Sequence, residues 1–523
     1  MQIIQFRLRD LRRFSPARLL SGRWRRLTIA LALVLGLLLP QLATVSSVRA
    51  MMGDPGEIFH EREFRGVWAA SVVNIDWPSA QGQSVARQKD DLVAILDRMK
   101  SLNLNALVLQ VRPTGDALYA SELEPWSYWL TGREGRAPAP YFDPLEFAIE
   151  EAHARGIELH AWFNPYRAKL GDDYSLAPQN MANRFPQYAY QYGNLVWMDP
   201  GAEEVQQHTY DVILDVTRRY DVDGIHLDDY FYPYPKDGIE FPDGATYNAY
   251  RQSGGRLSRD NWRRNNVNVL VEKLYRGIKA EKSNVKFGIS PFGIYRPGQP
   301  PGIQGMDQYA RIYADPKLWL QEGWVDYMAP QLYWRIEQTE QSYPRLLEWW
   351  TSQNTADRHI YAGNYLSKLD NRDWDLGEFW RQVDISRQPG VVRNGSLGNI
   401  FFSLKVFMQD WYGVNDYFRR YIYPTPALTP AMPWLDAIAP DPVEVANIEA
   451  GRIGWEPNYS EDLQGLTLYK QTGDKWTLQR ILPPTATSAD VPPGTYAVRP
   501  VDRAANEGEP SIVTVRGIRR AGT

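Results

Sequence analysis

Two adjacent carboxylates, Asp228 and Asp229, stand at the end of a short apolar segment over residues 222–233. Within it, Ile225 and Leu227 alternate with polar residues, and this period of two predicts a strand whose apolar side faces covering helices. Aspartate is a poor strand residue and is costly to bury, so two in a row indicate a strand end that serves chemistry. A structural alternative is a strand cap in which Asp229 is bonded to its own loop.

Paired carboxylates are the groups that most glycoside hydrolases use. The reaction needs a protonated acid at the leaving oxygen and a second group that attacks or stabilises the anomeric carbon. Repulsion between neighbouring carboxylates raises the pKa of one of them, which keeps it protonated near neutral pH. Because adjacent strand residues point oppositely, the two side chains converge only if the chain bends at Asp229. The aromatic and proline residues at 230–233 favour such a bend.

Two catalytic routes are open for this pair. In the first, Asp228 is the nucleophile and the acid is Asp229 or a loop carboxylate. In the second, the acetamido oxygen of the substrate attacks, one aspartate orients that group and the other is the acid. We assign Asp229 as the acid and Asp228 as the orienting or nucleophilic carboxylate. The second route fits amino-sugar polymers.

The segments that must position this pair alternate along the chain. Eight strand-like segments separated by helical ones predict an α/β fold, a (β/α)8 TIM-type barrel, with long loops after strands two, three and four. The expected strands cover residues 64–73, 106–111, 157–163, 222–233, 285–290, 325–334, 359–366 and 399–407.

Polar and aromatic residues near the ends of these strands predict a substrate site, because the active sites of such barrels lie at the C-terminal strand ends. Amide, guanidinium, aromatic and carboxylate groups together suit an array of sugar hydroxyls. The predicted substrate-binding residues are Gln110, Arg112, Trp162, Asn164, Arg167, His226, Tyr230, Gln331, Tyr333, Trp334 and Lys405. Gln110 and Lys405 fit interior packing or loop anchoring equally well.

The chain divides into four expected parts. Residues 1–50 hold an arginine-rich start, an apolar run and small residues before position 51, which predicts a secretory signal peptide; an uncleaved membrane anchor is the alternative. The barrel is expected over residues 60–423 and a proline-rich linker over 424–433. A small β-sandwich resembling a fibronectin type III module is expected over 434–523, as a spacer or a sugar-binding module. We therefore expect an exported protein of the periplasm or cell envelope.

Composition narrows the possible partners. Without residues 1–50, which hold nine basic residues and one acidic residue, 49 basic residues face 61 acidic ones, a net charge near −12. Such an acidic protein is a poor candidate for binding nucleic acid. The chain has no cysteine, and its six histidines lack metal-ligand spacing. We expect a polysaccharide partner, no cofactor, no metal, and membrane contact only through an uncleaved signal segment; the oligomeric state stays open.

Four ordered segments resemble the glycosyl-hydrolase-like 10 family. They are residues 64–68 with 76–78 (FRGVW, DWP), 110–113 with 116–117 (QVRP, DA), 160–167 (HAWFNPYR) and 223–233 (DGIHLDDYFYP). The resemblance implies a (β/α)8 barrel of bacterial envelope proteins, some of which cleave the glycan strands of peptidoglycan, particularly strands stripped of their peptides. Relatives are often lipoproteins, whereas this chain lacks the required cysteine.

Residues 224–228 are also similar to the fourth-strand motif of the α-amylase clan, in which the final aspartate is the nucleophile. This similarity supports Asp228 as a central carboxylate. That clan carries its acid, a glutamate, on strand five, where residues 289–293 of this chain hold no carboxylate. The identity of the acid therefore does not carry over from the clan.

The leading hypothesis is an exported glycoside hydrolase that cleaves peptidoglycan glycan strands or a related amino-sugar polymer. One alternative is a noncatalytic cell-envelope protein that binds glycan in the same cleft. The other is a hydrolase of a neutral extracellular polysaccharide.

Overall fold

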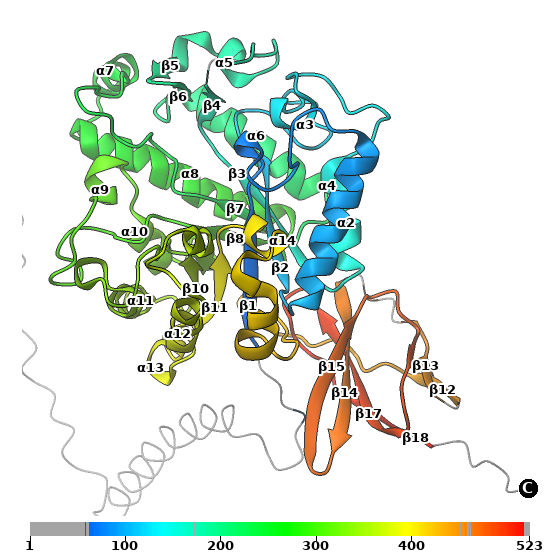
Figure 1. The fold of residues 1–523 in the computed structure, drawn as a ribbon. Coiled ribbons are helices and arrows are strands. Elements are labelled where there is room, and N and C mark those ends of the chain that lie inside the picture. Colours follow the sequence, from blue (N-terminus) through cyan, green and yellow to red (C-terminus); the bar gives the residue numbers. More distant parts are fainter. Residues whose placement is uncertain are drawn as a thin grey trace, which may run out of the picture. The chain divides into compact units, whose positions relative to one another are not determined.

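The computed structural model describes residues 58, 62–171, 173–449, 451–457, 460 and 462–516. Within these residues, eight parallel strands close into a barrel (Figure 1). In barrel order they are β1 (Phe64–Ala69), β11 (Ser396–Phe401), β10 (His359–Asn364), β9 (Tyr327–Met328), β8 (Lys286–Ile289), β7 (Gly224–Leu227), β3 (Glu158–Phe163) and β2 (Ala106–Arg112). The predicted TIM-type barrel is confirmed.

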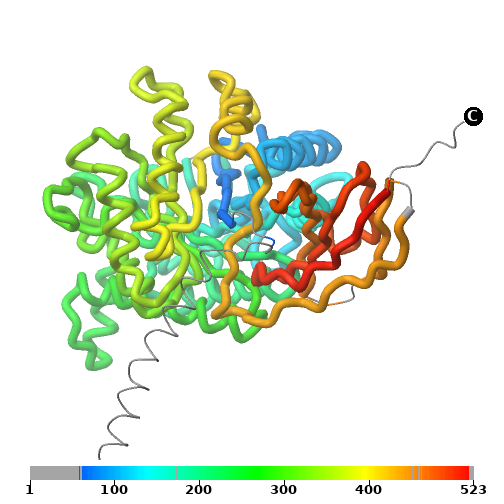
Figure 2. The backbone as a smooth tube through the Cα atoms, turned by 90° about the horizontal axis from the view of Figure 1, so that it is seen from below, coloured from blue at the N-terminus to red at the C-terminus, as the bar shows by residue number. Residues whose placement is uncertain are grey.

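Helices follow the strands and cover the outside of the barrel. The main ones are α2 (Val85–Ser101), α4 (Pro144–His153), α6 (Glu203–Arg219), α8 (Arg259–Glu281), α10 (Pro316–Gln321), α11 (Tyr343–Ser352) and α12 (Leu376–Ser386). Helix α4 shows why they begin where they do: Asp143 accepts hydrogen bonds from the first-turn amides, and Pro144 is the first helical residue. In Figure 2 the chain colours pass round the barrel from blue to yellow, and β11 pairs with β1.

Strand alternation divides the side chains between two apolar cores. Ile225 and Leu227 of β7 belong to the core between the strands and the helices, whereas Trp68 and Tyr327 belong to a second core inside the barrel. Gly288 makes room for the interior ring of Tyr327, because a Cβ there would lie 2.0 Å from that ring. Aromatic rings therefore fill the barrel interior beneath the strand ends.

Three long connections leave the carboxyl ends of β2, β3 and β7. They carry α3 (Tyr128–Thr131) after β2, then β4 (Arg167–Leu170), α5 (Met181–Arg184), β5 (Ala189–Tyr192) and β6 (Leu195–Met198) after β3, and α7 (Gly244–Gln252) after β7. Strands β4, β6 and β5 form a small antiparallel sheet. In Figure 1 these elements lie together above the barrel strands, so they surround the end at which the predicted site residues emerge.

Several observed strands end earlier than the expected segments, β9 and β11 among them. Only residues Tyr327–Met328 of the segment 325–334 form a strand, β9. Pro330, which has no N–H to donate to a ladder, follows closely. The last strand ends at Phe401, and Lys405 begins the short helix α14 (Lys405–Met408). Lys405 is therefore not a strand residue, which corrects the reason for including it in the site.

The expected linker, residues 424–433, is held against the barrel. Arg65 donates a hydrogen bond of 2.6 Å to the carbonyl of Thr425, and the Thr429 hydroxyl donates one of 2.6 Å to Glu158. The chain then forms two antiparallel sheets with a shared apolar core. One contains β12 (Val445–Glu449), β13 (Arg452–Trp455) and β16 (Ser488–Asp490); the other contains β15 (Lys475–Leu482), β14 (Leu463–Thr472), β17 (Gly494–Asp502) and β18 (Ser511–Val515).

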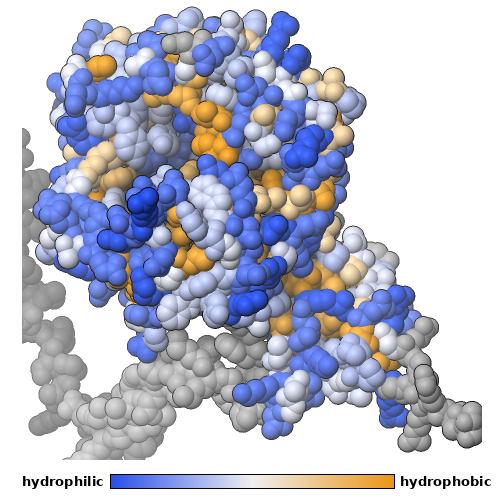
Figure 3. Space-filling view, viewed as in Figure 1, coloured by the Kyte–Doolittle hydropathy of each residue, from blue (hydrophilic) through white to orange (hydrophobic). Residues whose placement is uncertain are grey.

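The predicted signal peptide, residues 1–50, lies outside the described residues. In the part of the chain that is described, no helix combines the length and apolar character needed to cross a membrane. The face drawn in Figure 3 is mainly hydrophilic, and apolar residues appear on it in separate patches. Most large apolar side chains of the described chain are instead buried in the cores.

Candidate active site

A cavity of about 340 Å³ lies at the carboxyl ends of the barrel strands. Its lining combines one carboxylate and one guanidinium with many aromatic rings, among the residues that the structure describes. The lining residues are Trp68, Ala70, Val72, Ile75, Gln110, Trp162, Arg167, Asp228, Tyr230, Ser290, Gln331, Tyr333, Tyr365 and Phe402. Rings with a few convergent polar groups are typical of a small-molecule or sugar site.

Asp228 is the carboxylate of this cavity, and it is 4% exposed. Its Oδ2 accepts hydrogen bonds from Trp162 Nε1, at 3.2 Å, and from the amide of Asn164, while Oδ1 accepts one from the backbone N–H of Tyr230, at 3.2 Å. Burial raises the pKa of Asp228 to about 6, against the opposing effects of the Arg167 charge and these hydrogen bonds. Asp228 is therefore a fixed carboxylate that ionises near neutral pH.

Asp229 is 1% exposed and does not itself line the cavity. Its Oδ2 accepts a hydrogen bond from the hydroxyl of Tyr234, in its own loop. Burial and then the charge of Asp228 raise the pKa of Asp229 to about 7, while hydrogen bonds from Tyr234 and Gln331 lower it. The two carboxyl groups titrate as an interacting pair, and Asp229 is the member that holds a proton to higher pH. Its bond to Tyr234 also matches the structural alternative of a loop-bonded cap.

An amide chain connects the loop after β1 to Asp228. The Gln110 carbonyl accepts hydrogen bonds from the backbone N–H groups of Ser71 and Val72, at 3.0 and 2.9 Å. Its amide nitrogen donates to Asn164 Oδ1 at 2.6 Å, and Asn164 in turn donates to Asp228. Gln110 lines the cavity, whereas Asn164 acts through the orientation of Asp228.

Five other predicted residues line the cavity: Arg167, Gln331 and the aromatic residues Trp162, Tyr230 and Tyr333. Tyr230 lies beneath the Arg167 guanidinium, whose carbon is 5.5 Å from the ring centroid. Tyr333 packs against Tyr365 with ring centroids 4.7 Å apart. Gln331 donates from Nε2 to the carbonyl of Ser290 at 2.9 Å. Trp162 is the ring that donates to Asp228.

His226 lies in the barrel interior below the cavity. Its Nδ1 is 2.9 Å from the Tyr327 hydroxyl, and its Nε2 accepts from Trp68 Nε1 at 3.2 Å and lies 3.0 Å from Ser290 Oγ. Burial, followed by the charge of His160, lowers its pKa well below the ordinary value. His226 is a neutral interior residue that supports Trp68 and Ser290, and it does not line the cavity.

Three predicted substrate ligands lie elsewhere in the barrel. Arg112 is fully buried in an ion pair with Glu124; burial opposes ionisation of Glu124, but the Arg112 charge and hydrogen bonds lower its pKa to about 2. Lys405 lies with Nζ 5.6 Å from the Trp411 ring centroid. Trp334 packs edge-on against Phe292, with ring centroids 5.6 Å apart. None of these three is among the described residues that line the cavity.

The structure adds residues to the site that were not predicted. Trp68, Tyr365 and Phe402 line the cavity from β1 or from positions directly after β10 and β11. Tyr234 enters through its bond to Asp229. Trp68 is the next-to-last residue of β1 and the other three follow strands, which is the available signal, but aromatic residues at such positions are also common as packing residues.

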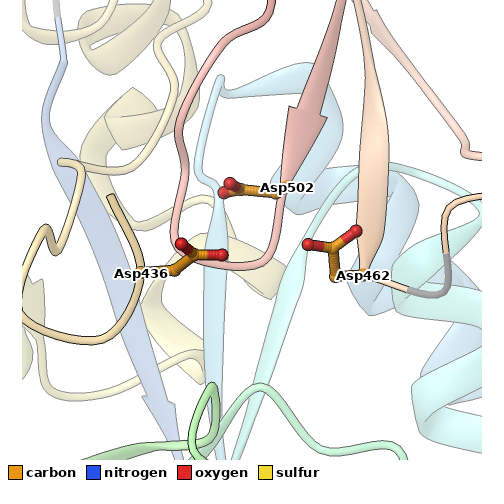
Figure 4. A group of neighbouring side chains, drawn as sticks. All are labelled: Asp436, Asp462 and Asp502. Atoms are coloured by element: carbon orange, nitrogen blue, oxygen red, sulfur yellow. The ribbon is translucent and has the colours of Figure 1, made fainter. Parts of the chain in front are cut away.

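Three carboxylates gather in the C-terminal part of the chain, away from the residues that line the cavity. The ligand oxygens of Asp436, Asp462 and Asp502 lie within 4.8 Å of one another (Figure 4). Asp502 already accepts hydrogen bonds of 2.8 Å from the backbone and side-chain nitrogens of Asn506. Burial raises the pKa of Asp502. Their spacing would allow these oxygens to approach a cation, and no step at the cavity involves them.

A closed parallel barrel with paired carboxylates at its strand ends is the arrangement expected of a (β/α)8 glycoside hydrolase. The chain belongs to the glycosyl hydrolase-like 10 family, whose sequence model matches residues 63–375. This match confirms the resemblance that the four segments indicated.

Two curated relatives support the same family membership. The chain is 41% identical over 406 residues to glycosyl hydrolase YngK of Bacillus subtilis (strain 168), which covers 75% of this chain and 78% of that protein. It is 36% identical over 353 residues to glycosyl hydrolase DigH of Escherichia coli (strain K12), covering 62% and 79%. The PgaB (BpsB) glycoside hydrolase domain from Bordetella bronchiseptica superposes with a TM-score of 0.46 at 15% identity, covering 69% of this chain and 99% of that domain.

Proposed function

We propose that this protein is an exported glycoside hydrolase of the periplasm or cell envelope that cleaves peptidoglycan glycan strands or a closely related amino-sugar polymer. The observation that carries the proposal is the pair of adjacent buried carboxyl groups with raised pKa values beside a ring-lined cavity. Perturbed pKa values of neighbouring carboxyl groups are typical of acid catalysis. The arginine-rich and apolar residues 1–50 support export.

Asp228 serves as the carboxylate that acts at the anomeric centre. Three donors, from Trp162, Asn164 and the Tyr230 backbone, hold it in place at the cavity wall. In the substrate-assisted route, its ionised oxygen accepts the N–H of the sugar's acetamido group and aligns the acetamido oxygen for attack. In the direct route, the same oxygen attacks the anomeric carbon. Both routes need this side chain ionised and immobile, which its contacts provide.

Asp229 serves as the acid that protonates the leaving oxygen. Its pKa of about 7 leaves it mostly protonated under mildly acidic conditions, while Asp228 becomes ionised at lower pH. The Tyr234 hydroxyl covers its carboxyl group, so substrate binding must draw Tyr234 away before the proton reaches the leaving oxygen. Catalytic hydrogen bonds often tighten only in the substrate complex, so this rearrangement is compatible with the geometry.

Product analysis tests the proposal. The mature protein, the Asp228→Asn variant and an Asp90→Asn control, which removes an exposed carboxylate on α2, are incubated with peptide-free glycan strands, intact sacculi and α-glucans. We expect amino-sugar oligosaccharides from peptide-free strands, produced by the wild type and the control and lost in Asp228→Asn. Turnover of α-glucans alone would replace this proposal with a neutral-polysaccharide hydrolase.

A noncatalytic glycan-binding protein is the second candidate. The position of Asp229 outside the cavity lining, with its carboxyl group bound by Tyr234, favours it. Tight binding of glycan strands with no released products, equal in the wild type and Asp228→Asn, would establish this alternative.

A further inference from the structure

We propose that Arg167 binds a carboxylate carried by the sugar that lies at Asp228, which makes the free lactyl carboxylate of muramic acid a recognition element. This inference rests on the proposed function and adds a residue that determines specificity. It follows from an arginine that is buried at the cavity wall and forms no ion pair within 4.0 Å with a carboxylate of the described residues.

The Arg167 side chain is held rigidly by neutral groups. It is 7% exposed, its Nε donates to the carbonyl of Pro113 at 2.9 Å, and its Nη2 donates to Asn164 Oδ1 at 3.1 Å. Tyr230 lies beneath the guanidinium. For Nη1, the described residues provide no hydrogen-bond partner. The guanidinium is therefore held in a fixed orientation before any ligand binds, and its Nη1 can still donate hydrogen bonds to a ligand.

Arg167 forms no ion pair with a described carboxylate, whereas the buried arginines Arg112 and Arg263 do. Arg112 pairs with Glu124, and Arg263 pairs with Asp243 at 2.6 Å. No carboxylate oxygen of the described residues lies within 4.0 Å of the Arg167 nitrogens. Asp228 interacts with the Arg167 charge from beyond this distance. A planar guanidinium matches a carboxylate in a two-point contact. An anionic ligand group in the cavity would make the direct ion pair that Arg167 lacks.

Asn164 fixes the spacing between the two charged groups of the cavity. One end of its amide accepts from Arg167, and the other end donates to Asp228. Asp228 and Arg167 are therefore held by the same amide group, so two substituents of one sugar can reach them together. Muramic acid carries its acetamido group at C2 and its lactyl ether at C3. When a peptide stem is attached, the lactyl carboxylate becomes a neutral amide and this contact is lost.

A simpler role for Arg167 is that of a counter-ion, because its charge lowers the pKa of Asp228. That role predicts a change in the pH profile when Arg167 is replaced. It predicts no dependence on the carboxylate of the substrate. The two roles are therefore separated by changing the substrate as well as the protein.

The test compares kcat/KM for peptide-free strands with kcat/KM for the same strands after conversion of their carboxyl groups to methylamides. For the wild type we expect the acidic strands to be preferred by about 10- to 100-fold, as for a hydrogen bond to a charged group. In Arg167→Gln the preference falls to within about threefold of unity, and Arg167→Lys keeps part of it. Lys169→Gln removes a charge on the same strand outside the cavity, and it keeps the wild-type preference.

Two results overturn the inference while leaving the proposed function intact. They are equal cleavage of both strand forms by the wild type, and a full preference retained by a folded Arg167→Gln or Arg167→Lys variant. If Arg167→Gln fails to fold in thermal denaturation, the wild-type ratio and the Arg167→Lys ratio still decide. Failure of the wild type to cleave either form overturns the proposed function and this inference together.

Discussion

Replacing Tyr234 with phenylalanine tests whether Asp229 is the acid of the reaction. The Tyr234 hydroxyl donates to Asp229, and this bond lowers a pKa that burial and the charge of Asp228 raise to about 7. A hydrogen bond to a charged group contributes about 1.5–3 kcal/mol, and one pKa unit corresponds to about 1.4 kcal/mol. Removing the hydroxyl therefore raises the pKa of Asp229 by about 1–2 units.

This change moves the pH dependence of activity in a defined direction. An acid catalyst works only while protonated, so kcat/KM falls as the pH rises through the pKa of Asp229. We expect the alkaline limb near pH 7 in the wild type and about 1–2 pH units higher in Tyr234→Phe. Reducing ends released from peptide-free strands are measured from about pH 5 to about pH 10.

The control for this experiment is Tyr412→Phe, because Tyr412 is 74% exposed and lies outside the cavity lining. Its alkaline limb is expected to match that of the wild type. If the limb of Tyr234→Phe stays in place or moves to lower pH, Asp229 is not the group whose protonation controls the rate.

Three further predictions concern stability. Asp229→Asn should raise the free energy of unfolding by about 2–4 kcal/mol at pH 8 but not at pH 4. The folded-state pKa of Asp229 is raised to about 7, so in the wild type this group destabilises the folded protein increasingly as the pH rises from the unfolded-state pKa to about 7. Urea titrations at both pH values check this. Arg112→Met leaves the buried Glu124 without its guanidinium and should cost about 3–5 kcal/mol in urea unfolding, and Arg112→Met with Glu124→Gln should recover part of the loss. Gly288→Ala places a Cβ 2.0 Å from the Tyr327 ring and should cost about 1–3 kcal/mol or more in thermal unfolding; an unchanged midpoint would show that the interior can shift.

The barrel and the place of Asp228 at a strand end can be predicted from the sequence, because both depend on local alternation. How deep a side chain lies within the barrel cannot be predicted in this way. His226 belongs to β7 and Asp228 follows its last residue, and alternation would place both on the same side. His226 lies one layer lower, where Trp68 and Tyr327 occupy the space that a ligand would need. The rings that fill that layer come from strands far apart in the sequence.

The direction in which the Arg112 side chain points could not be predicted from the sequence either. The pairing of β2 with β3 shifts register between Gln110 and Arg112, so one extra residue turns Arg112 out of the alternation. Its partner, Glu124, lies in the long loop that follows. A bulge and a loop conformation both depend on tertiary contacts, so no local sequence pattern predicts them.

Cleavage of peptide-free glycan strands by Asp228→Asn and Asp229→Asn tests most directly whether the adjacent carboxylates perform the reaction. New reducing ends are counted for both variants, the wild type and Asp90→Asn, and thermal denaturation establishes that each protein is folded. We expect both variants to be slower than the wild type and the control by at least about a hundredfold. A folded variant at either aspartate that keeps a rate close to that of the wild type would contradict the role of the pair in catalysis.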